Sequence, residues 1–424
     1  MDGASGWRTF EYVLNIIVMV FQFSLIPVFL YQLVIGMFGW VKRKDIPAER
    51  FKPVKSFAII VAAHNEEMVI GNIVRNMRGL NYPEDLYDLF VIADNCDDNT
   101  AKVARENGAQ VFERFNDKQR GKGFALEWMF EKLFKMEKKY DAVCVFDADN
   151  LVSSNYLMEM NKQLCKGHTV IQGYLDSKNP HDSLIAGSYS ITYWINNRVF
   201  QLPRYYLGLS CAVGGTGFVV ATEVLKEIGW GATCLTEDLE FTIKLVLKGK
   251  KVYWSHEAIV YDEKPLTLAQ SWKQRKRWMQ GQADCAVRYL KDLVTKVIRD
   301  RSWVAFDVVM YLVQPLIIVL NGVALVFNVL RMVLFMDMSK LFTPGTLITV
   351  LTFLFLTYFF LIFVALEGKV TPKIIAYFLF FPVYNLTWIP IIVQGFKNRN
   401  DRVWDHTKHT RSLEIDDLEQ LEKV

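Results

Sequence analysis

Asp147 and Asp149 are the two side chains of this sequence that are best suited to bind a divalent metal ion. They flank one alanine directly after the apolar run 142–146. Because alternate residues of an extended chain point to the same side, both carboxylates face one way. Two hard oxygen ligands suit Mg²⁺ or Mn²⁺ that bridges a diphosphate and neutralises charge on a leaving group. The alternative is a turn at a strand end, in which the same side chains cap the next element.

Two other polar clusters also follow apolar runs. Asp94 begins a stretch rich in Asp and Asn, and Ala63, His64 and Glu66 belong to the other cluster. Asn and Asp favour turns and helix N-caps, and acidic residues complement the dipole at a helix start. Taken singly, the residue types of each cluster are explained by a turn that caps the following helix. The functional alternative is that Asp94 accepts a hydrogen bond from a base or a ribose.

Lys122 lies in a basic turn, between Gly121 and Gly123, that opens a helical pattern. Backbone freedom, a helix N-terminus and an ammonium group together suit contact with a phosphate group. A solvated loop is an equally good interpretation of these residues.

Glu237 and Asp238 open the amphipathic pattern 239–247, directly after Thr236. Thr is a good N-cap and acidic residues stabilise a first helical turn, so a structural role explains both. The functional alternative makes Asp238 a general base that removes the proton of an acceptor hydroxyl group. The adjacent acid can raise the pKa of such a base.

Gln274, Arg277 and Trp278 lie in the stretch 266–301, which mixes Trp, Arg and Lys with apolar residues. This composition is typical of a helix in the membrane interface, where Trp and Arg are common anchors. The functional alternative is that Trp278 stacks on the face of a sugar ring while Arg277 pairs with a diphosphate. Arginine suits that role because its guanidinium binds phosphate through two hydrogen bonds.

These side chains need a framework that brings them together, and the first two thirds of the chain have the pattern of an α/β domain. Short apolar runs at 57–61, 89–92 and 142–146 are typical of buried strands, and helical patterns separate them. The alternation predicts βαβ units and a mostly parallel sheet. Polar residues end each run, and ligands of open α/β sheets collect at the carboxyl ends of strands. We therefore expect one site along that edge.

Four apolar segments are long enough to cross a bilayer, which takes about 20 apolar residues. They are 12–40, 304–335, 346–366 and 374–396. Basic residues follow the first segment, so the positive-inside rule places residues 42 onward in the cytosol. The basic tail 397–411 should lie in the cytosol too. Three complete crossings after the cytosolic domain would instead leave the tail on the outside. We therefore expect the last segment, which contains Pro382 and Pro390, to bend.

Composition narrows the expected partners. The 424 residues carry a formal net charge of +4 at pH 7. This mild charge suits attraction to anionic lipid better than a nucleic-acid groove, so we expect membrane lipid and no nucleic acid as partners. The six cysteines have no CxxC or zinc-type spacing, and we expect neither disulfides nor a structural metal.

Taken in order, these motifs resemble those of the membrane-integrated family 2 glycosyltransferases. That group includes the synthases of cellulose, hyaluronan, chitin-type oligomers and poly-N-acetylglucosamine. Their shared signature is three separated aspartates followed by Q-x-x-R-W, and the matching residues here are Asp94, Asp149, Asp238, Gln274, Arg277 and Trp278. The resemblance runs from around Lys55 to the C-terminus.

The resemblance implies a GT-A fold, which is an α/β domain with a Rossmann-like mixed sheet, and binding of a UDP-sugar with Mg²⁺ or Mn²⁺. By position, Asp94 matches a contact to uridine and Lys122 a contact to the diphosphate. Asp147 and Asp149 match the metal-binding pair, and Asp238 matches the general base. The implied donor-site residues are Ala63, His64, Glu66, Asp94, Lys122 and Asp147, and those of the acceptor side are Glu237, Gln274, Arg277 and Trp278.

Trp404, Thr407 and Lys408 resemble the cytosolic W-x-x-T-[RK] element that approaches the nucleotide in this family. Two departures occur in the donor motifs. Family members often have a proline in the first motif and a second aspartate in the next, where this chain has Ala62 and Ala93. Contacts to uridine can therefore differ in detail.

We predict five regions along the chain. They are a transmembrane anchor (1–42), a cytosolic GT-A glycosyltransferase domain (43–265), amphipathic interface helices (266–302), an α-helical transmembrane region (303–396) and a cytosolic tail (397–424).

The predicted protein is a multi-pass enzyme of the cell membrane, a processive and inverting β-glycosyltransferase with its catalytic domain in the cytosol. It uses a UDP-sugar to elongate and export an extracellular polysaccharide of the N-acetylglucosamine or glucose type. The acceptor is a growing glycan or a lipid-linked sugar, and a small accessory membrane subunit is a candidate partner. Two alternatives stay open: transfer of a single sugar to a membrane lipid, and a non-enzymatic sensor or scaffold subunit.

Overall fold

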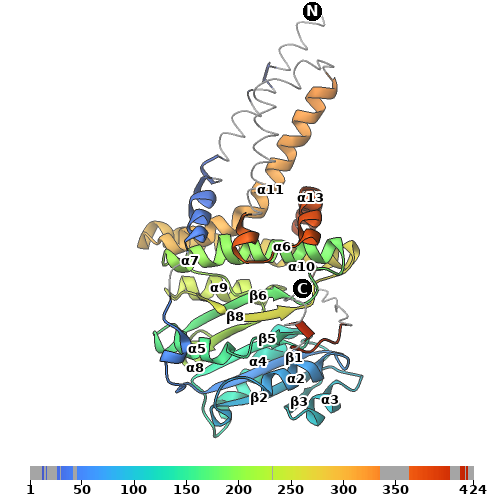
Figure 1. Cartoon of the computed structure of the whole chain (residues 1–424). Coiled ribbons are helices and arrows are strands. Elements are labelled where there is room, and N and C mark those ends of the chain that lie inside the picture. Colours follow the sequence, from blue (N-terminus) through green and yellow to red (C-terminus); the bar gives the residue numbers. More distant parts are fainter. Residues whose placement is uncertain are drawn as a thin grey trace, which may run out of the picture.

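The computed structural model describes residues 30–41, 45–231, 233–334, 362–401, 411–415 and 417–418, with short pieces before residue 29; for 324–334 it describes the backbone alone. An eight-stranded mixed sheet forms the body of the molecule. Helices cover its faces, a further layer of helices lies across it, and apolar helices rise from that layer (Figure 1).

The sheet has the strand order β3-β2-β1-β4-β7-β6-β8-β5. Its strands are β1 (Phe57–Ala63), β2 (Tyr87–Asp94), β3 (Gln110–Arg114), β4 (Ala142–Asp147), β5 (Leu151–Val152), β6 (Val170–Ser177), β7 (Phe218–Ala221) and β8 (Tyr253–Asp262). The first four strands pair in parallel, as do β6 and β8, whereas β7 is antiparallel to both of its neighbours and β5 to β8. The predicted mixed α/β sheet is therefore confirmed, with most of its parallel pairs in the N-terminal half.

The helices of the sheet domain are α2 (Ile70–Arg78), α3 (Thr100–Glu106), α4 (Lys122–Lys135), α5 (Tyr156–Cys165), α8 (Thr222–Ile228) and α9 (Glu237–Leu247). The layer across the sheet contains α6 (Leu184–Ile195), the π-helix η4 (Asn196–Gln201), α7 (Leu202–Tyr206) and α10 (Leu268–Asp300). The helices that leave or border this layer are α11 (Trp303–Leu334), α13 (Pro372–Leu386) and α14 (Trp388–Lys397).

Alternation along the strands divides the core between the two faces of the sheet. In β1, Ala58 and Ile60 belong to a buried cluster that includes residues of α4 and α6. Phe57, Ile59 and Val61 point to the other face and pack with residues of α2 and α5. Because a shift of one residue would exchange the two faces, this packing sets the register of the parallel strands.

That register brings three polar strand ends to one edge of the sheet. Ala63 of β1 pairs with Ala93 of β2, and Ala62 pairs with Asp147 of β4. His64, which follows β1, therefore lies between the ends of β2 and β4, which carry Asp94 and Asp147. The structure thus brings these polar strand ends together at the carboxyl edge of the parallel strands, where the sequence predicted the site.

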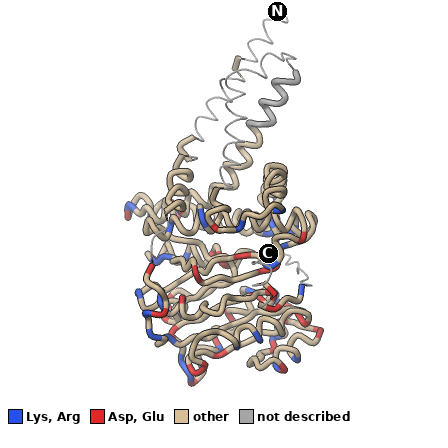
Figure 2. The backbone as a smooth tube through the Cα atoms, in the orientation of Figure 1, with Lys and Arg blue, Asp and Glu red and all other residues tan. Residues whose placement is uncertain are grey.

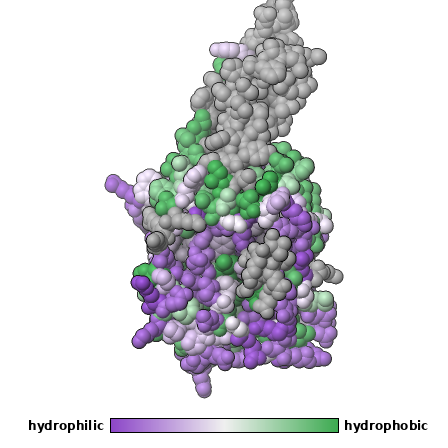
Figure 3. Space-filling view, in the orientation of Figure 1, coloured by the Kyte–Doolittle hydropathy of each residue, from purple (hydrophilic) through white to green (hydrophobic). Residues whose placement is uncertain are grey.

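The helical layer carries the apolar surface of the molecule. Figure 3 shows hydrophobic side chains gathered over this layer and the base of the rising helices, whereas the sheet body below is mostly hydrophilic. Val287, Ile298 and Trp303 are among the exposed apolar residues there. Charged residues are spread over the sheet body, whereas the described parts of the helices above the layer are mostly uncharged (Figure 2). This distribution supports the predicted interfacial role of the 266–301 stretch.

Among the residues that the structure describes, two helical stretches are long and apolar enough to cross a membrane by length and composition: Trp303–Val323, with a mean hydropathy of 2.1, and Pro372–Lys397, with 1.6. The second is broken at Thr387, between α13 and α14, and α14 packs along α10 through Met279, Ile391 and Ile392. The last apolar segment is thus bent, as expected, whereas α11 is one helix. Of the predicted segment 346–366, residues 346–361 lie outside the described residues.

A buried ion pair joins the helical layer to the rising helices. The guanidinium of Arg204 in α7 binds the carboxylate of Asp307 in α11 through Nε at 2.7 Å and Nη2 at 2.9 Å. The Tyr31 hydroxyl group, on the N-terminal helix, donates to the same carboxylate at 2.9 Å. Because a charge buried without its partner is strongly destabilising, these contacts hold the two regions in one arrangement.

Candidate functional site

A cavity of about 310 Å³ opens at the carboxyl edge of the parallel strands, beneath α10. The sequence-predicted residues that line it are Ala63, His64, Glu66, Asp94, Lys122, Asp147, Asp149, Glu237, Asp238, Gln274, Arg277 and Trp278. They come from six separate parts of the chain, so the fold brings every predicted donor-side and acceptor-side residue to one place. Trp404, Thr407 and Lys408 lie outside the described residues.

The ends of β1 and β2 are turned away from the sheet by two asparagines. Asn65 and Asn95 both have left-handed backbone conformations, with φ of 55° and 51°. Asn tolerates this conformation better than most residues, which accounts for its place at both strand ends. The side chain of Asn65 accepts a hydrogen bond from the backbone N–H of Asp97 at 3.0 Å and does not cap α2, which begins at Ile70.

Asp94 is held from two sides. Its carboxylate Oδ1 accepts a hydrogen bond from Arg114 Nη1 at 2.6 Å, in a buried ion pair. Its backbone carbonyl lies 2.7 Å from Nδ1 of His64. The helix-capping role that the sequence suggested for this cluster belongs to Asp98, whose Oδ1 accepts from the backbone N–H of Thr100. Asp94 therefore caps no helix, and it lines the cavity.

Lys122 begins α4 and connects two walls of the cavity. The preceding Gly121 has a φ of 106°, which only glycine adopts readily and which turns the chain into the helix. The ammonium group lies 2.5 Å from Asp147 Oδ1 and donates to the carbonyl of Gly215 at 2.7 Å. A cation at a helix N-terminus beside an acidic pair is a suitable contact for a diphosphate.

Asp147 and Asp149 fit a divalent cation that is shared with a substrate. Both line the cavity, and Asp149 Oδ2 accepts from the backbone N–H of Glu263 at 3.0 Å, which fixes its orientation. Across the part of the chain that the structure describes, no three His, Cys, Asp or Glu side chains form a metal-binding group. Two carboxylates suffice for Mg²⁺, which usually keeps water ligands and completes its shell with substrate phosphates.

Glu237 and Asp238 form the first turn of α9 and face the cavity. Loss of surrounding water, with the neighbouring charge of Asp238, raises the pKa of Glu237 to about 7. Loss of water also raises the pKa of Asp238, and its Oδ1 accepts from the backbone N–H of Leu239 at 2.8 Å. Thr236 precedes this turn, but its side chain makes no capping hydrogen bond. A carboxylate with a raised pKa in a cavity suits a general base.

Gln274, Arg277 and Trp278 lie on one face of α10, because residues three and four apart are neighbours on a helix. Gln274 Oε1 accepts a hydrogen bond from the Tyr189 hydroxyl group at 2.8 Å, and the rings of Trp278 and Tyr189 lie 6.0 Å apart. Tyr189 comes from α6, so this wall of the cavity contains two helices of the layer.

Arg275 points away from the cavity and is fully buried. Its guanidinium lies over the rings of Tyr384 and Trp388, at 4.5 and 4.9 Å, and donates to Thr387 Oγ1 at 2.9 Å. It therefore holds the break between α13 and α14 against α10. One helix turn thus carries both the cavity wall and the contact with the apolar C-terminal helices.

Sequence reasoning missed several residues of the cavity. Asp262, at the end of β8, also lines it, and burial raises its pKa to about 6. Tyr193 of α6 lines it as well. Only the polar end of an apolar run marked Asp262 in the sequence, and nothing marked Tyr193. The described part of the tail reaches this region, since the backbone N–H of Arg411 donates to Glu263 at 3.2 Å.

Comparison with known proteins gives three findings. A family model described as "Glycosyltransferase like family 2" matches residues 53–281. A beta-monoglucosyldiacylglycerol synthase of Trichormus variabilis is 29% identical over 239 residues, which are 53% of this chain and 48% of that protein. A poly-beta-1,6-N-acetyl-D-glucosamine synthase of Staphylococcus epidermidis is 25% identical over 288 residues, which are 63% of this chain and 67% of that protein. This chain thus spans about half to two thirds of the curated relatives it matches.

Among solved structures, the fold is similar to that of a mannosyltransferase from Pyrobaculum calidifontis, which was solved in complex with GDP-Man and Mn²⁺. The TM-score is 0.60 at 15% identity, and the alignment covers 92% of this chain and 99% of the other. The likeness confirms the predicted GT-A fold.

Proposed function

This chain belongs to glycosyltransferase-like family 2, and on that premise we propose that it is an inverting β-glycosyltransferase that uses a UDP-sugar. The observation that carries the proposal is the convergence of Asp94, Asp149 and Asp238 on one cavity with the acceptor-side residues of α10. Asp94 and Lys122 bind the uridine and the diphosphate in this proposal.

Asp238 acts as the general base. Its carboxylate accepts the proton of an acceptor hydroxyl group, whose oxygen attacks the anomeric carbon of the donor sugar. The bond from that carbon to the diphosphate breaks at the same time, and its electron pair leaves with UDP. A single displacement inverts the configuration and forms no covalent sugar–enzyme intermediate, so one base is sufficient. Asp147 and Asp149 would hold a divalent cation, which would neutralise the charge that develops on UDP.

We propose a growing polysaccharide as the acceptor. Gln274, Arg277 and Trp278 form one wall of the cavity, and the aromatic rings of Trp278 and Tyr189 suit the faces of sugar rings. The apolar stretches at α11 and at Pro372–Lys397 support a multi-pass membrane protein with this domain in the cytosol, which elongates and exports the glycan. Membrane lipid surrounds those stretches, and a small accessory subunit would complete the export path.

Transfer of one sugar to a lipid is the second candidate. The relative from Trichormus variabilis is named as a synthase of a glucosyl lipid and is slightly more similar to this chain than the polysaccharide synthase. A cavity beneath helices of an apolar layer is also open to a lipid-linked acceptor.

Incubating membranes that contain the protein with radiolabelled UDP-N-acetylglucosamine or UDP-glucose, and sizing the product, tests both candidates. A high-molecular-weight product that is missing with Asp238→Asn supports the polysaccharide. A labelled lipid carrying one sugar would assign the second candidate. If the correctly folded protein transferred sugar from no nucleotide sugar, the proposal that it is an enzyme would be contradicted.

A further inference from the structure

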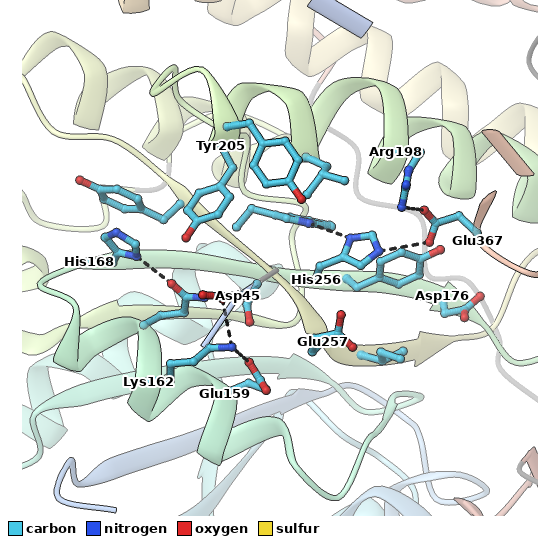
Figure 4. Close-up of a pocket in the computed structure, with 18 of the residues that line it drawn as sticks. Asp45, Glu159, Lys162, His168, Asp176, Arg198, Tyr205, His256, Glu257 and Glu367 are labelled. Carbon is cyan, nitrogen blue, oxygen red and sulfur yellow. Dashed lines mark hydrogen bonds and ion pairs between the residues drawn. The ribbon is translucent and has the colours of Figure 1, made fainter. Parts of the chain in front are cut away.

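A second cavity, of about 690 Å³, lies between the sheet and the helical layer. Figure 4 shows Arg198 and Tyr205 reaching into it from the layer above, with Glu159 and Lys162 of α5 below. None of its lining residues lines the cavity at Asp238. The volume is within the range of about 300–1,000 Å³ that is typical of sites for small organic ligands.

The charges at one end of this second cavity are paired within the protein. The carboxylate of Glu367 binds Arg198 at 3.0 Å and His256 at 3.3 Å (Figure 4). Beside them, the ammonium group of Lys369 lies 2.9 Å from the carboxylate of Asp176. Each basic group at this end therefore has an acidic partner.

The charges at the other end are paired in the same way. The ammonium group of Lys162 lies between the carboxylates of Glu159 and Asp45, 3.2 Å from the latter. Asp45 also accepts from Lys166 at 2.6 Å. Lys251 and Glu257 also line the cavity, form no ion pair with a described residue and carry opposite charges. The cavity therefore has no large excess of either charge with which to attract a strongly charged ligand.

Two buried donors on the walls still need an acceptor. Arg198 and Ser255 are 2% and 1% exposed, and both line the cavity. Arg198 Nε donates to the carbonyl of Gly39 and Nη1 to Glu367, but Nη2 and the Ser255 hydroxyl oxygen have no hydrogen-bond partner among the residues that the structure describes. Buried polar atoms nearly always have a partner in native proteins, so these two point to oxygen atoms supplied by a ligand.

Three aromatic rings that contact one another line the same cavity. The rings of His168 and Tyr253 are stacked, 3.8 Å apart, and Tyr205 meets His168 edge-on at 5.9 Å. Burial, with the nearby charge of Lys166, lowers the pKa of His168 to about 4, so its ring is neutral at pH 7. Aromatic rings next to an ion-paired guanidinium and a neutral hydroxyl group suit a ligand that has both an apolar face and several oxygen atoms.

We propose that this cavity is a second binding site, for a neutral saccharide. Hydroxyl or ring oxygens of the sugar accept hydrogen bonds from Arg198 and Ser255, and a sugar ring packs its C–H face on Tyr205 or Tyr253. The cavity walls come from the catalytic domain and from Asp45 and Glu367. Asp45 lies next to the N-terminal apolar helix and Glu367 next to the C-terminal apolar helices, so the bound saccharide contacts all three regions of the chain. Binding at this site depends on its own contacts and does not require the transfer reaction.

The test uses the full-length protein in lipid nanodiscs, saturated with UDP, and two soluble probes, cellotriose and chitotriose. Saturation-transfer NMR and calorimetry are expected to detect binding of at least one probe. Ser255→Ala should weaken it about tenfold, because one hydrogen bond to a buried group is lost. Tyr205→Ala should weaken it further, and Tyr205→Phe should not. Phe115→Ala, which removes an exposed aromatic ring that lines neither cavity, is the matched control and should leave the affinity unchanged.

A measurement on the unsubstituted protein makes the test independent of variant folding. Hydrogen–deuterium exchange should show protection by the probe in residues 202–209 and 251–259, which carry walls of this cavity. Protection confined to the Asp238 cavity, or loss of binding in Trp278→Ala with retention in Ser255→Ala, would overturn the proposal. So would binding of inorganic phosphate or ADP in the absence of binding by either saccharide.

Discussion

The ammonium group of Lys122 lies 2.5 Å from the carboxylate of Asp147 and 2.7 Å from the carbonyl of Gly215. One lysine thus connects the end of a central strand with the glycine-rich loop 214–217. A diphosphate bound here and the carboxylate of Asp147 would both interact with the same cation. We therefore expect Lys122 to exchange part of its contact with Asp147 for the donor.

Replacing Lys122 with Met should raise the KM for the UDP-sugar about 10- to 100-fold, because a hydrogen bond between charged groups is lost. The effect on kcat should be smaller, since the base is untouched. Steady-state kinetics at fixed metal concentration measure both parameters. Lys118→Met, at an exposed position on the same loop, is the control. An unchanged KM would remove Lys122 from the donor site.

Asp238→Asn should lower the rate of transfer by about 10²- to 10⁴-fold, the usual contribution of a general base. The affinity for UDP should stay the same, because Asn is of the same size and the donor contacts lie elsewhere in the cavity. Calorimetric titration with UDP and a radiolabel assay on the same preparation separate the two effects. Turnover close to that of the unsubstituted protein would assign the base to another residue.

The rate of transfer should fall as the pH decreases below neutral, because burial raises the pKa of Asp238 above its ordinary value. The pKa of Glu237 is raised to about 7, and that of its neighbour Asp238 is raised as well, so the pair takes up a proton in this range. Transfer requires the carboxylate form of Asp238. In Glu237→Gln the neighbouring negative charge is gone, so the pKa of Asp238 should fall and the acid limb of the kcat profile should move to lower pH. An acid limb that stays in place would show that the two groups do not interact.

Gly281→Ala should reduce kcat by about tenfold or more, although Gly281 lies on α10 outside the cavity. A Cβ atom at this position would lie 2.2 Å from Thr236 Oγ1 and 2.5 Å from its Cγ2, so Thr236 must move. Thr236 directly precedes Glu237 and Asp238, and a misplacement of about 1 Å can lower a rate by about 10²-fold.

Gly79→Ala is the matched control for this substitution. Its added Cβ would have its nearest contact at 3.6 Å, an ordinary van der Waals distance. Both variants should bind UDP like the unsubstituted protein. If Gly281→Ala keeps full activity, the spacing between α10 and the start of α9 does not control the base.

The sequence predicted the parts of the site that depend on local patterns. Apolar runs that end in polar residues marked β1, β2 and β4, and parallel pairing of such strands brings their ends together. The spacing of Gln274, Arg277 and Trp278 placed them on one helix face. Both inferences rest on fixed backbone periods, which a single sequence shows directly.

Contacts between distant segments could not be read in this way. Arg114 pairs with Asp94, and Tyr189 with Gln274, across 20 and 85 positions. Arg275 directly follows Gln274, but its guanidinium binds Thr387 at the break between α13 and α14 and does not line the cavity. The pairing partner of a polar side chain depends on which segments the core brings together, and that choice is made by packing over the whole chain.

The sequence by itself therefore determined the α/β sheet, the order of the acidic clusters and their one shared edge, because strand and helix periods and the order of the chain specify them. Only the tertiary structure decided that Asp262 and Tyr193 belong to that edge, that the last apolar segment breaks at Thr387, and that a second cavity exists beneath Arg198. Those features arise where surfaces from separate segments meet, and the shape left between packed surfaces is a property of their three-dimensional arrangement.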